Sequence, residues 1–496
     1  MAIQQSETPH LQIIVRRLLL IVLLAAATAG CSKDDGPAQH IASNAAEVVL
    51  RYEAGAEASF TVTASGPWSF STTGEGFEVS GPAVGERGET TLTVTATEEN
   101  TGLQRRRLGS ITLQLDNGAA SAEVTIEQNT STAPQTLLMY MPWSGNLTSY
   151  FEQNIADMAK TVAAGYLGDT RLLVYFMPND TQALLYELYY DNGESVRLDH
   201  RTCDPAPDFT TAEGIATILG MVQQTAPAER YAMTIGSHGM AWLPVSGIYS
   251  RPSAAGARER EYWEFESEGA ALTRWFGGTS DRYRTDISTL AEGIEQAGME
   301  MEYILFDDCY MSSVEVAYDL RHVSRHLIGS TCEIMAYGFP YADMGRYLVG
   351  EPDYENICES FYRFYSTYQW PYGTIGVTDC AELERLADIM KRINAGDVFD
   401  GSQLGELQAL DGYSPTRFFD LGDYVRHLCT SPTLLAEFEE QLARTVPYHR
   451  HTEEYYSMSG GARPIETFSG ITTSDPSTSE ATLQKQQTSW WKATHE

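Results

Sequence analysis

Apolar and polar residues alternate in short runs between residues 45 and 128, and Gly and Thr are frequent where the runs end. Three clear examples are SFTVTA at 59–64, TTLTVT at 90–95 and AEVTIE at 122–127. A period of two places successive side chains on opposite faces of a strand, and several short strands of this kind favour a small β-sandwich. The polar, proline-containing segment at 129–135 is the expected linker.

From residue 136 the pattern changes to apolar runs that alternate with amphipathic stretches. The apolar runs predict strands at residues 137–141, 171–177, 231–235, 303–306, 326–330 and 373–378. The amphipathic stretches predict helices at residues 212–224, 287–296, 313–325 and 357–368. Strands that alternate with helices imply right-handed βαβ units. We therefore expect an α/β fold, with a mostly parallel sheet flanked by helices, preceded by a small all-β sandwich domain.

Two further segments complete the pattern. Residues 246–286 are polar and rich in Gly, Ser, Arg and Glu, which predicts a long inserted loop. The part from about residue 385 onward is expected to supply helices and a closing strand that pack on the sheet. Trp490 and Trp491 in this part are interpreted as core or edge aromatics rather than as a binding site.

The N-terminus predicts export. Two arginines precede an apolar run at 18–27, and small residues follow it, which describes a signal peptide whose apolar run is too short to span a bilayer. Ala-Gly directly before Cys31 is similar to the cleavage box of bacterial lipoproteins, although Thr28 stands where leucine is usual. We expect residues 1–30 to be a lipoprotein signal peptide, Cys31 to carry the lipid and residues 31–44 to form a tether.

The predicted location follows from this reading. The sequence SKDD at 32–35 resembles the acidic export tag of surface lipoproteins in some Gram-negative bacteria. The protein is therefore expected to be an exported outer-membrane lipoprotein that faces the cell surface or the periplasm. An ordinary cleaved signal peptide, with no lipid anchor, is the alternative.

Length and charge narrow the classes of function. A chain of 496 residues is too long for one compact core, so we expect a sandwich domain at 45–128 and a second domain at 136–496. The formal net charge of −34 leaves no large basic face, which argues against nucleic-acid binding. The six cysteines after Cys31 are scattered and lack metal-binding spacing, so the sequence predicts no metal site and no required cofactor.

Two of the predicted strands end in chemically reactive residues. The run YAMTIGSHG at 231–239 carries His238, and YILFDDCYM at 303–311 carries Cys309. Because the carboxyl ends of parallel strands meet at one edge of a sheet, these side chains are expected to lie close together. Cysteine attacks as a thiolate, which a nearby imidazole and a helix beginning just after the cysteine both favour. The backbone N–H groups of Gly239 and Cys309 are the expected oxyanion donors. On these residues alone, a structural role for both side chains stays open.

The flanking residues carry a resemblance to a known family. They include LMYM at 138–141, GNL at 145–147, SHGMAW at 237–242, ILFDDCYMSSVEVAYDLR at 304–321, IGSTCE at 328–333, GFPY at 338–341, DLGDY at 420–424 and SGI at 469–471. In order and strand context these motifs resemble the clostripain-like cysteine peptidases, type C11, from residue 136 to near the C-terminus. The resemblance implies a caspase-like fold and a cysteine endopeptidase with His238 and Cys309 as its dyad.

The resemblance also implies a specificity. It assigns Asp307 to the floor of the S1 pocket, where a carboxylate would pair with Arg or Lys at the P1 position of protein or peptide substrates. Two departures put a strict preference in doubt: PWSG at 142–145 lacks an acid common in the family, and STCE at 330–333 replaces Ser-Pro-x-Glu. A caspase-like peptidase with a non-basic P1 preference is therefore one alternative. A non-catalytic surface protein that binds glycan or protein is another.

Some properties vary among the relatives and stay open here. Some relatives use calcium, and no loop of calcium-ligand spacing stands out in this chain, so a calcium requirement is left open. Some relatives mature by internal cleavage after a basic residue between the dyad members. The inserted loop offers four arginines for such a cut: Arg251, Arg258, Arg260 and Arg274.

The N-terminal strands carry a second resemblance. The segments GPWSFS at 66–71 and VTIEQ at 124–128 are similar to those of the BACON family, a module common near the N-terminus of exported gut-bacterial enzymes. A carbohydrate-binding role has been suggested for that module, and Trp68 is the candidate for stacking on a sugar. The alternative is that Trp68 fills the core of a spacer domain.

Overall fold

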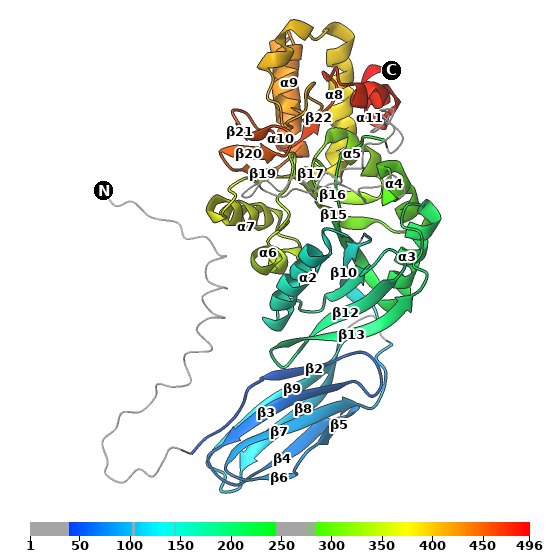
Figure 1. Cartoon of the computed structure of the whole chain (residues 1–496). Helices are drawn as coiled ribbons and strands as arrows, with labels where there is room; N and C mark the ends of the chain where they lie inside the picture. Colours follow the sequence, from blue (N-terminus) through cyan, green and yellow to red (C-terminus); the bar gives the residue numbers. More distant parts are fainter. Residues whose placement is uncertain (1–38, 102–104, 144, 245–276, 278–282) are drawn as a thin grey trace, which may run out of the picture.

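The computed structural model describes residues 39–101, 105–143, 145–244, 277 and 283–496, in a smaller all-β region followed by a larger α/β region (Figure 1). The predicted signal peptide, the predicted lipid site Cys31 and nearly all of the predicted inserted loop lie outside these residues. Within the described ranges no helix is both long and apolar enough to cross a membrane.

The N-terminal region consists of two sheets packed face to face. One sheet has the order β1-β3-β7-β5 and the other the order β2-β9-β8-β4-β6. Their strands are β1 (Ile41–Ser43), β2 (Glu47–Leu50), β3 (Glu57–Ala64), β4 (Trp68–Gly74), β5 (Phe77–Ser80), β6 (Val84–Gly85), β7 (Gly88–Ala96), β8 (Arg106–Leu115) and β9 (Ser121–Gln128). Alternate residues of β3 and β7 are buried, as the period-two pattern predicts.

Trp68 lies in the core between these two sheets. Its side chain is 0% exposed and belongs to the same apolar cluster as Phe60 and Val94. The indole face is therefore covered by protein, and the interpretation of Trp68 as core filler is the one that the structure supports.

A nine-stranded sheet forms the centre of the larger region, in the order β13-β12-β11-β10-β14-β15-β16-β17-β19. Its strands are β10 (Ala133–Met141), β11 (Arg171–Phe176), β12 (Ala183–Asp191), β13 (Glu194–Cys203), β14 (Ala228–Gly236), β15 (Met301–Asp307), β16 (Ser324–Gly329), β17 (Thr374–Asp379) and β19 (Tyr448–His451). The five central strands, from β11 to β16, run parallel, and antiparallel strands complete both edges. The predicted fold class is confirmed.

Helices cover both faces of this sheet. The main ones are α2 (Thr148–Ala163), α3 (Ala212–Thr225), α4 (Ile287–Gln296), α5 (Val314–Leu320), α6 (Tyr341–Leu348), α7 (Tyr354–Thr367), α8 (Leu383–Gly396), α9 (Leu421–Leu428), α10 (Pro432–Thr445) and α11 (Ser489–His495). Helices α2, α6 and α7 pack on one another, and α3, α4 and α5 form a second group on the other side of the strands (Figure 1). The C-terminal part supplies α8 to α11 and the closing strand β19, as predicted, and Trp490 is fully buried.

One predicted helix is wrong in length. The amphipathic stretch at 313–325 predicted a single helix, but α5 ends at Leu320 and β16 begins at Ser324. The chain must turn within residues 321–323 to bring β16 alongside β15. The sheet pairing therefore overrides the local helical pattern.

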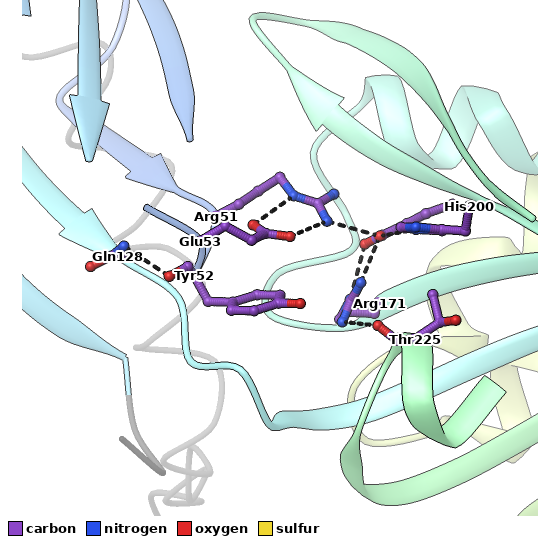
Figure 2. A network of polar contacts seen from close by, with 8 residues as sticks. Arg51, Tyr52, Glu53, Gln128, Arg171, His200 and Thr225 are labelled. Atoms are coloured by element: carbon purple, nitrogen blue, oxygen red, sulfur yellow. Dashed lines mark hydrogen bonds and ion pairs between the residues drawn. The ribbon is translucent and has the colours of Figure 1, made fainter. Parts of the chain in front are cut away.

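The two regions meet at a network of buried charges (Figure 2). Only residues 129–132 separate β9 from β10, and Arg51, just beyond β2, reaches across to Glu187 on β12 at 3.2 Å. Glu187 also accepts two hydrogen bonds from Arg171, at 2.7 and 3.1 Å, and pairs with His200 at 3.1 Å. The carboxylate of Glu187, in the larger region, thus binds Arg51 of the smaller region as well as Arg171 and His200 of its own region.

Two aromatic contacts cross the same boundary in opposite directions. Arg51 lies 5.1 Å from the ring centroid of Tyr189, and Arg171 lies 5.6 Å from that of Tyr52. A cleft of about 650 Å³ remains beside these contacts, and the Arg51 side chain keeps 21% of its surface exposed. The interface is therefore polar and partly open, with Glu187 at its buried centre.

Candidate active site

The structure brings together the two segments that carry the predicted reactive residues. Strands β14 and β15 are neighbours, with Gly236 paired to Asp307, so His238 and Cys309 both follow two positions after matched strand ends. A Cβ atom on Gly239 would lie 2.2 Å from the carbonyl oxygen of Cys309 and 2.8 Å from its backbone nitrogen. The two segments are therefore in direct contact, and only glycine fits at position 239.

Asp308 fastens the two strand ends to each other. Its Oδ1 accepts a hydrogen bond from the backbone N–H of Ser237 at 2.6 Å, and its side chain is fully buried. Ser237 Oγ in turn accepts from the backbone N–H of Gly277 at 3.1 Å, and the backbone N–H of His238 donates to the carbonyl of Gly277 at 3.2 Å. These bonds give Asp308 a structural role at the junction of the two strand ends.

Cys309 lies on a tight backbone turn. Tyr310, directly after it, has a φ of 63°, a left-handed conformation that is uncommon outside glycine. The turn is held by a hydrogen bond from the Tyr310 backbone N–H to the carbonyl of Cys332 at 2.9 Å, and by one from the Tyr310 hydroxyl to Glu333 at 2.7 Å. The thiol accepts a hydrogen bond from the backbone N–H of Ile334 at 3.4 Å. Strain of this kind often marks a functional site.

His238 is contacted by the loop that follows β10. Its Nε2 lies 3.2 Å from Oδ1 of Asn146, and its ring packs against Trp143 with centroids 4.9 Å apart and planes at 65°. Asn146 lies within GNL at 145–147, one of the motifs that carry the family resemblance, and the resemblance implied no role for it. The two residues are 92 positions apart, so the only signal in the sequence was a polar residue just after a predicted strand.

Asp307, the predicted specificity residue, is the last residue of β15 and is fully buried. Its Oδ1 accepts a hydrogen bond from the backbone N–H of Phe339 at 3.0 Å. The loop that carries Phe339 is itself held by a bond from Tyr365 to the carbonyl of Gly338 at 2.7 Å. The carboxylate is thus fixed in orientation, two residues before Cys309.

A second buried carboxylate, Glu315, lies in the first turn of α5, just beyond Cys309. It accepts hydrogen bonds from the hydroxyls of Ser313 at 2.5 Å and Thr473 at 3.1 Å, and from the backbone N–H of Ser474 at 2.7 Å. Burial and the nearby charge of Asp475 raise the pKa of Glu315 to about 7. Burial also raises the pKa of Asp475, to about 6.

Further hydrogen bonds link the surroundings of Glu315 to the histidine segment and to the C-terminal part of the chain. Trp242 Nε1 donates to the hydroxyl of Ser474 at 2.9 Å, four positions after His238. Lys485 donates to the carbonyls of Asp475 at 2.6 Å and Ser477 at 2.7 Å, and desolvation lowers its pKa. We call this group of residues the Glu315 cluster: Trp242, Glu315, Ser474, Asp475 and Lys485. The Glu315 cluster connects both strand ends to the last part of the chain.

Three of the other cysteines are deeply buried. All six cysteines in the described ranges are free thiols. Burial raises the pKa of Cys332, Cys358 and Cys380 to about 12 in each case, which makes them poor nucleophiles. Among the described residues, no group of three or more His, Cys, Asp or Glu side chains is arranged to hold a metal ion.

Comparisons with known proteins identify the family. The Clostripain family (peptidase C11) model matches residues 262–403. The solved structure of a secreted C11 cysteine protease from Bacteroides thetaiotaomicron, iotapain, is 53% identical, with a TM-score of 0.68, and the match covers 73% of this chain and 100% of that chain. An inactive zymogen C11 protease from Parabacteroides distasonis is 25% identical, with a TM-score of 0.61, covering 74% of this chain and 99% of that one.

A clostripain from B. thetaiotaomicron in complex with a peptide inhibitor is 61% identical over 45% of this chain and 99% of that chain, with a TM-score of 0.44. The search of curated proteins gave no match. Because the match to the 53% identical protease covers that chain completely, this chain belongs to the clostripain family. It is a cysteine peptidase with the α/β fold of that family.

Proposed function

We propose that this peptidase is an endopeptidase that cleaves after Arg or Lys, with Cys309 as the nucleophile and His238 as its proton-transfer partner. The observation that carries the proposal is the contact between the two strand ends, where Gly239 lies directly against the backbone of Cys309. Cys309 is the thiol whose backbone lies against the His238–Gly239 segment, while burial raises the pKa of Cys332, Cys358 and Cys380 to about 12.

The proposed reaction has two steps. The thiolate of Cys309 attacks the scissile carbonyl carbon, and a thioester forms as the C–N bond breaks, with the imidazolium of His238 giving its proton to the leaving amine. Water then attacks the thioester while His238 accepts its proton, and the C–S bond breaks to release the acid and the thiolate. The backbone N–H groups of Gly239 and Cys309 are the proposed donors to the oxyanion in both steps.

Asp307 is the proposed selector of a basic P1 residue. Its buried carboxylate lies two residues before the nucleophile and is oriented by the backbone N–H of Phe339. A guanidinium or ammonium group would gain a charge-assisted hydrogen bond there, in a partly desolvated site where such bonds are strong. A neutral P1 side chain would form no such bond and would therefore bind less tightly.

The proposed location is the outer membrane, through a lipid on Cys31, with the N-terminal sandwich between the anchor and the peptidase. The support is the signal-peptide pattern and the small residues before Cys31. A related protease is described as secreted. Replacing Cys31 by Ala should release the protein from membranes, and metabolic labelling with a fatty acid should mark the wild type only.

Peptide hydrolysis tests the proposal directly. Fluorogenic peptides that differ only in Arg, Lys, Asn, Asp or Ala at P1 would be compared for wild type, Cys309→Ala and Asp307→Asn. We expect cleavage after Arg or Lys, its complete loss in Cys309→Ala, and a selective fall in kcat/KM of about 100-fold for basic substrates in Asp307→Asn.

The other outcomes separate the alternatives. Cysteine-dependent cleavage after a non-basic residue would keep the peptidase and reject the role of Asp307. Cleavage that persists in Cys309→Ala would reject the nucleophile. Parallel assays with a calcium chelator and with added calcium would show whether the reaction needs the ion. Glycan binding by the sandwich, the other alternative, draws no support from Trp68, whose indole is fully buried.

A further inference from the structure

We propose that Asn146 is a positioning residue for the reaction: it accepts a hydrogen bond from Nε2–H of His238 and so leaves Nδ1 as the nitrogen that exchanges protons with the thiol and the leaving amine. This inference rests on the proposed dyad. The observation behind it is the 3.2 Å distance between His238 Nε2 and Asn146 Oδ1.

The chemistry of the amide makes this contact directional. A neutral imidazole carries one N–H and one lone pair, and the partner of one nitrogen decides which tautomer is present. An amide oxygen can only accept, so it favours the proton on Nε2 in the neutral ring and bonds equally to the imidazolium. The same bond therefore persists while Nδ1 gains and loses its proton. The ring does not have to turn between the two steps of the reaction.

The loop that carries Asn146 is built to hold it in place. Gly145 has a φ of 143°, and a Cβ there would lie 2.6 Å from the ring of Trp143, so this position admits only glycine. The backbone N–H of Gly145 donates to the hydroxyl of Thr148 at 2.8 Å, at the start of α2. Trp143 is buried against the imidazole of His238. One short loop thus supplies both an apolar wall and a hydrogen-bond acceptor to the histidine.

The rival explanation is that an exposed asparagine merely happens to lie near the ring. Electrostatics separates the two explanations. A carboxylate at the same position would keep the acceptor and stabilise the imidazolium, which raises the pKa of the histidine. A leucine of similar volume would remove the acceptor, so the imidazolium would lose a partner and its pKa would fall. If Asn146 had no role as an acceptor, the leucine variant would leave the pKa of the histidine unchanged.

The experiment compares wild type, Asn146→Leu, Asn146→Asp and the control Ser149→Ala, an exposed residue at the start of α2. For a P1-basic peptide we expect Asn146→Leu to lower kcat about 10- to 100-fold with little change in KM, as the loss of a residue that orients a functional histidine does elsewhere. The alkaline limb of its pH profile should move to lower pH. Asn146→Asp should retain most of kcat and move that limb to higher pH, and Ser149→Ala should match wild type.

Two results would overturn the inference. Wild-type kcat and an unmoved alkaline limb in Asn146→Leu would show that the contact does nothing for the reaction. Equal losses of kcat in Asn146→Leu and Asn146→Asp, with both limbs of the pH profile unmoved, would indicate a general disturbance of the loop. Thermal unfolding of each variant identifies any that fail to fold, and the opposite pH shifts of the two variants cannot arise from misfolding.

A readout without substrate separates this inference from the proposed function. The rate at which iodoacetamide alkylates Cys309 is measured against pH by mass spectrometry. A weaker imidazolium stabilises the thiolate less, so the midpoint should rise in Asn146→Leu. A raised midpoint in a protein that cleaves none of the peptides would keep the His238–Asn146 contact and reject the specificity. An unchanged midpoint would reject the role of Asn146 even if wild type is active.

Discussion

Two buried carboxylates in this protein have pKa values shifted in opposite directions. Glu187 lies at the boundary of the two regions and Glu315 lies beneath the candidate active site, with side chains that are both almost fully covered. Desolvation alone would raise the pKa of each. At Glu187 it is outweighed by hydrogen bonds from His200 and Arg171 and by the charge of Arg51, which hold the pKa well below its usual range. At Glu315 desolvation and the charge of Asp475 raise the pKa to about 7.

The pKa values of Glu187 and Glu315 differ because their bonding and charge partners differ, not because one is buried more deeply than the other. Glu187 is surrounded by cations from both regions, so its ionised form is the stable one. Glu315 is surrounded by two hydroxyls and a backbone N–H, so its charge is only partly compensated. A buried charge with cationic partners stabilises the junction of two parts while it is ionised, whereas a buried acid with neutral hydrogen-bond partners stabilises the fold while it is protonated.

The largest expected effect comes from removing the charge at the boundary. Glu187→Ala leaves Arg171 and Arg51 without their shared carboxylate, and breaking a buried pair in this way costs about 3–5 kcal/mol. Chemical unfolding should show the loss. Glu194→Ala, an exposed acid on the same hairpin, should leave stability unchanged. A loss below 1 kcal/mol in Glu187→Ala would mean that the network contributes little net stability.

Arg51→Ala tests the part of the network that joins the two regions. This side chain is partly exposed, so its loss should cost about 1 kcal/mol. The clearer expected result is faster cleavage by a nonspecific protease within residues 129–132, because the sandwich would separate more often from the larger region. Equal cleavage rates for the variant and wild type would show that other contacts hold the two regions together.

The pH dependence of stability should have opposite signs at the two sites. The folded-state pKa of Glu187 is lowered, so its contribution is present above about pH 4.5 and is lost as the pH falls further. The folded-state pKa of Glu315 is raised, so its contribution is largest below about pH 4.5 and is lost as the pH rises towards 7. Glu187→Gln should therefore be less stable than wild type at neutral pH, and this difference in stability should shrink in acid.

By the same argument, Glu315→Gln should gain in stability relative to wild type between about pH 5 and 8. Thermal unfolding midpoints measured across this range give the comparison. Because Asp475 also has a raised pKa, the double variant Glu315→Gln with Asp475→Asn should show the larger gain. Parallel pH curves for wild type and Glu315→Gln would contradict the assignment.

The smallest expected effect concerns the link between the Glu315 cluster and the histidine segment. Trp242→Phe removes the donor to Ser474 and keeps most of the ring, which should cost about 1 kcal/mol. Because Trp242 follows His238 closely in the chain, kcat should also fall, by less than about tenfold. Wild-type kcat in the variant would show that this link stabilises the fold without positioning the histidine.

Local patterns in the sequence were enough to predict the five parallel strands and the approach of the His238 and Cys309 segments. Each strand is encoded by its own apolar run, and parallel order brings matched strand ends together. The hairpin of β12 and β13, the Asn146 contact and the Glu187 network were not predicted. Asn146 lies 92 positions from His238 and Arg51 lies 136 from Glu187, so these contacts depend on how the elements pack. Helix α5 is shorter than predicted for the same reason, because the chain has to leave the helix for β16 to pair with β15.

The contact at Gly239 has a consequence for how this chain can change over evolutionary time. A single added methyl group there would overlap the carbonyl oxygen of Cys309, so every substitution at this codon pushes the two strand ends apart. Most loop positions tolerate amino-acid substitution during evolution. At position 239, by contrast, a substitution in the histidine segment also displaces the cysteine segment. A lineage that loses this glycine would separate the His238 and Cys309 segments while keeping both residues, and it would still resemble an active peptidase by its motifs.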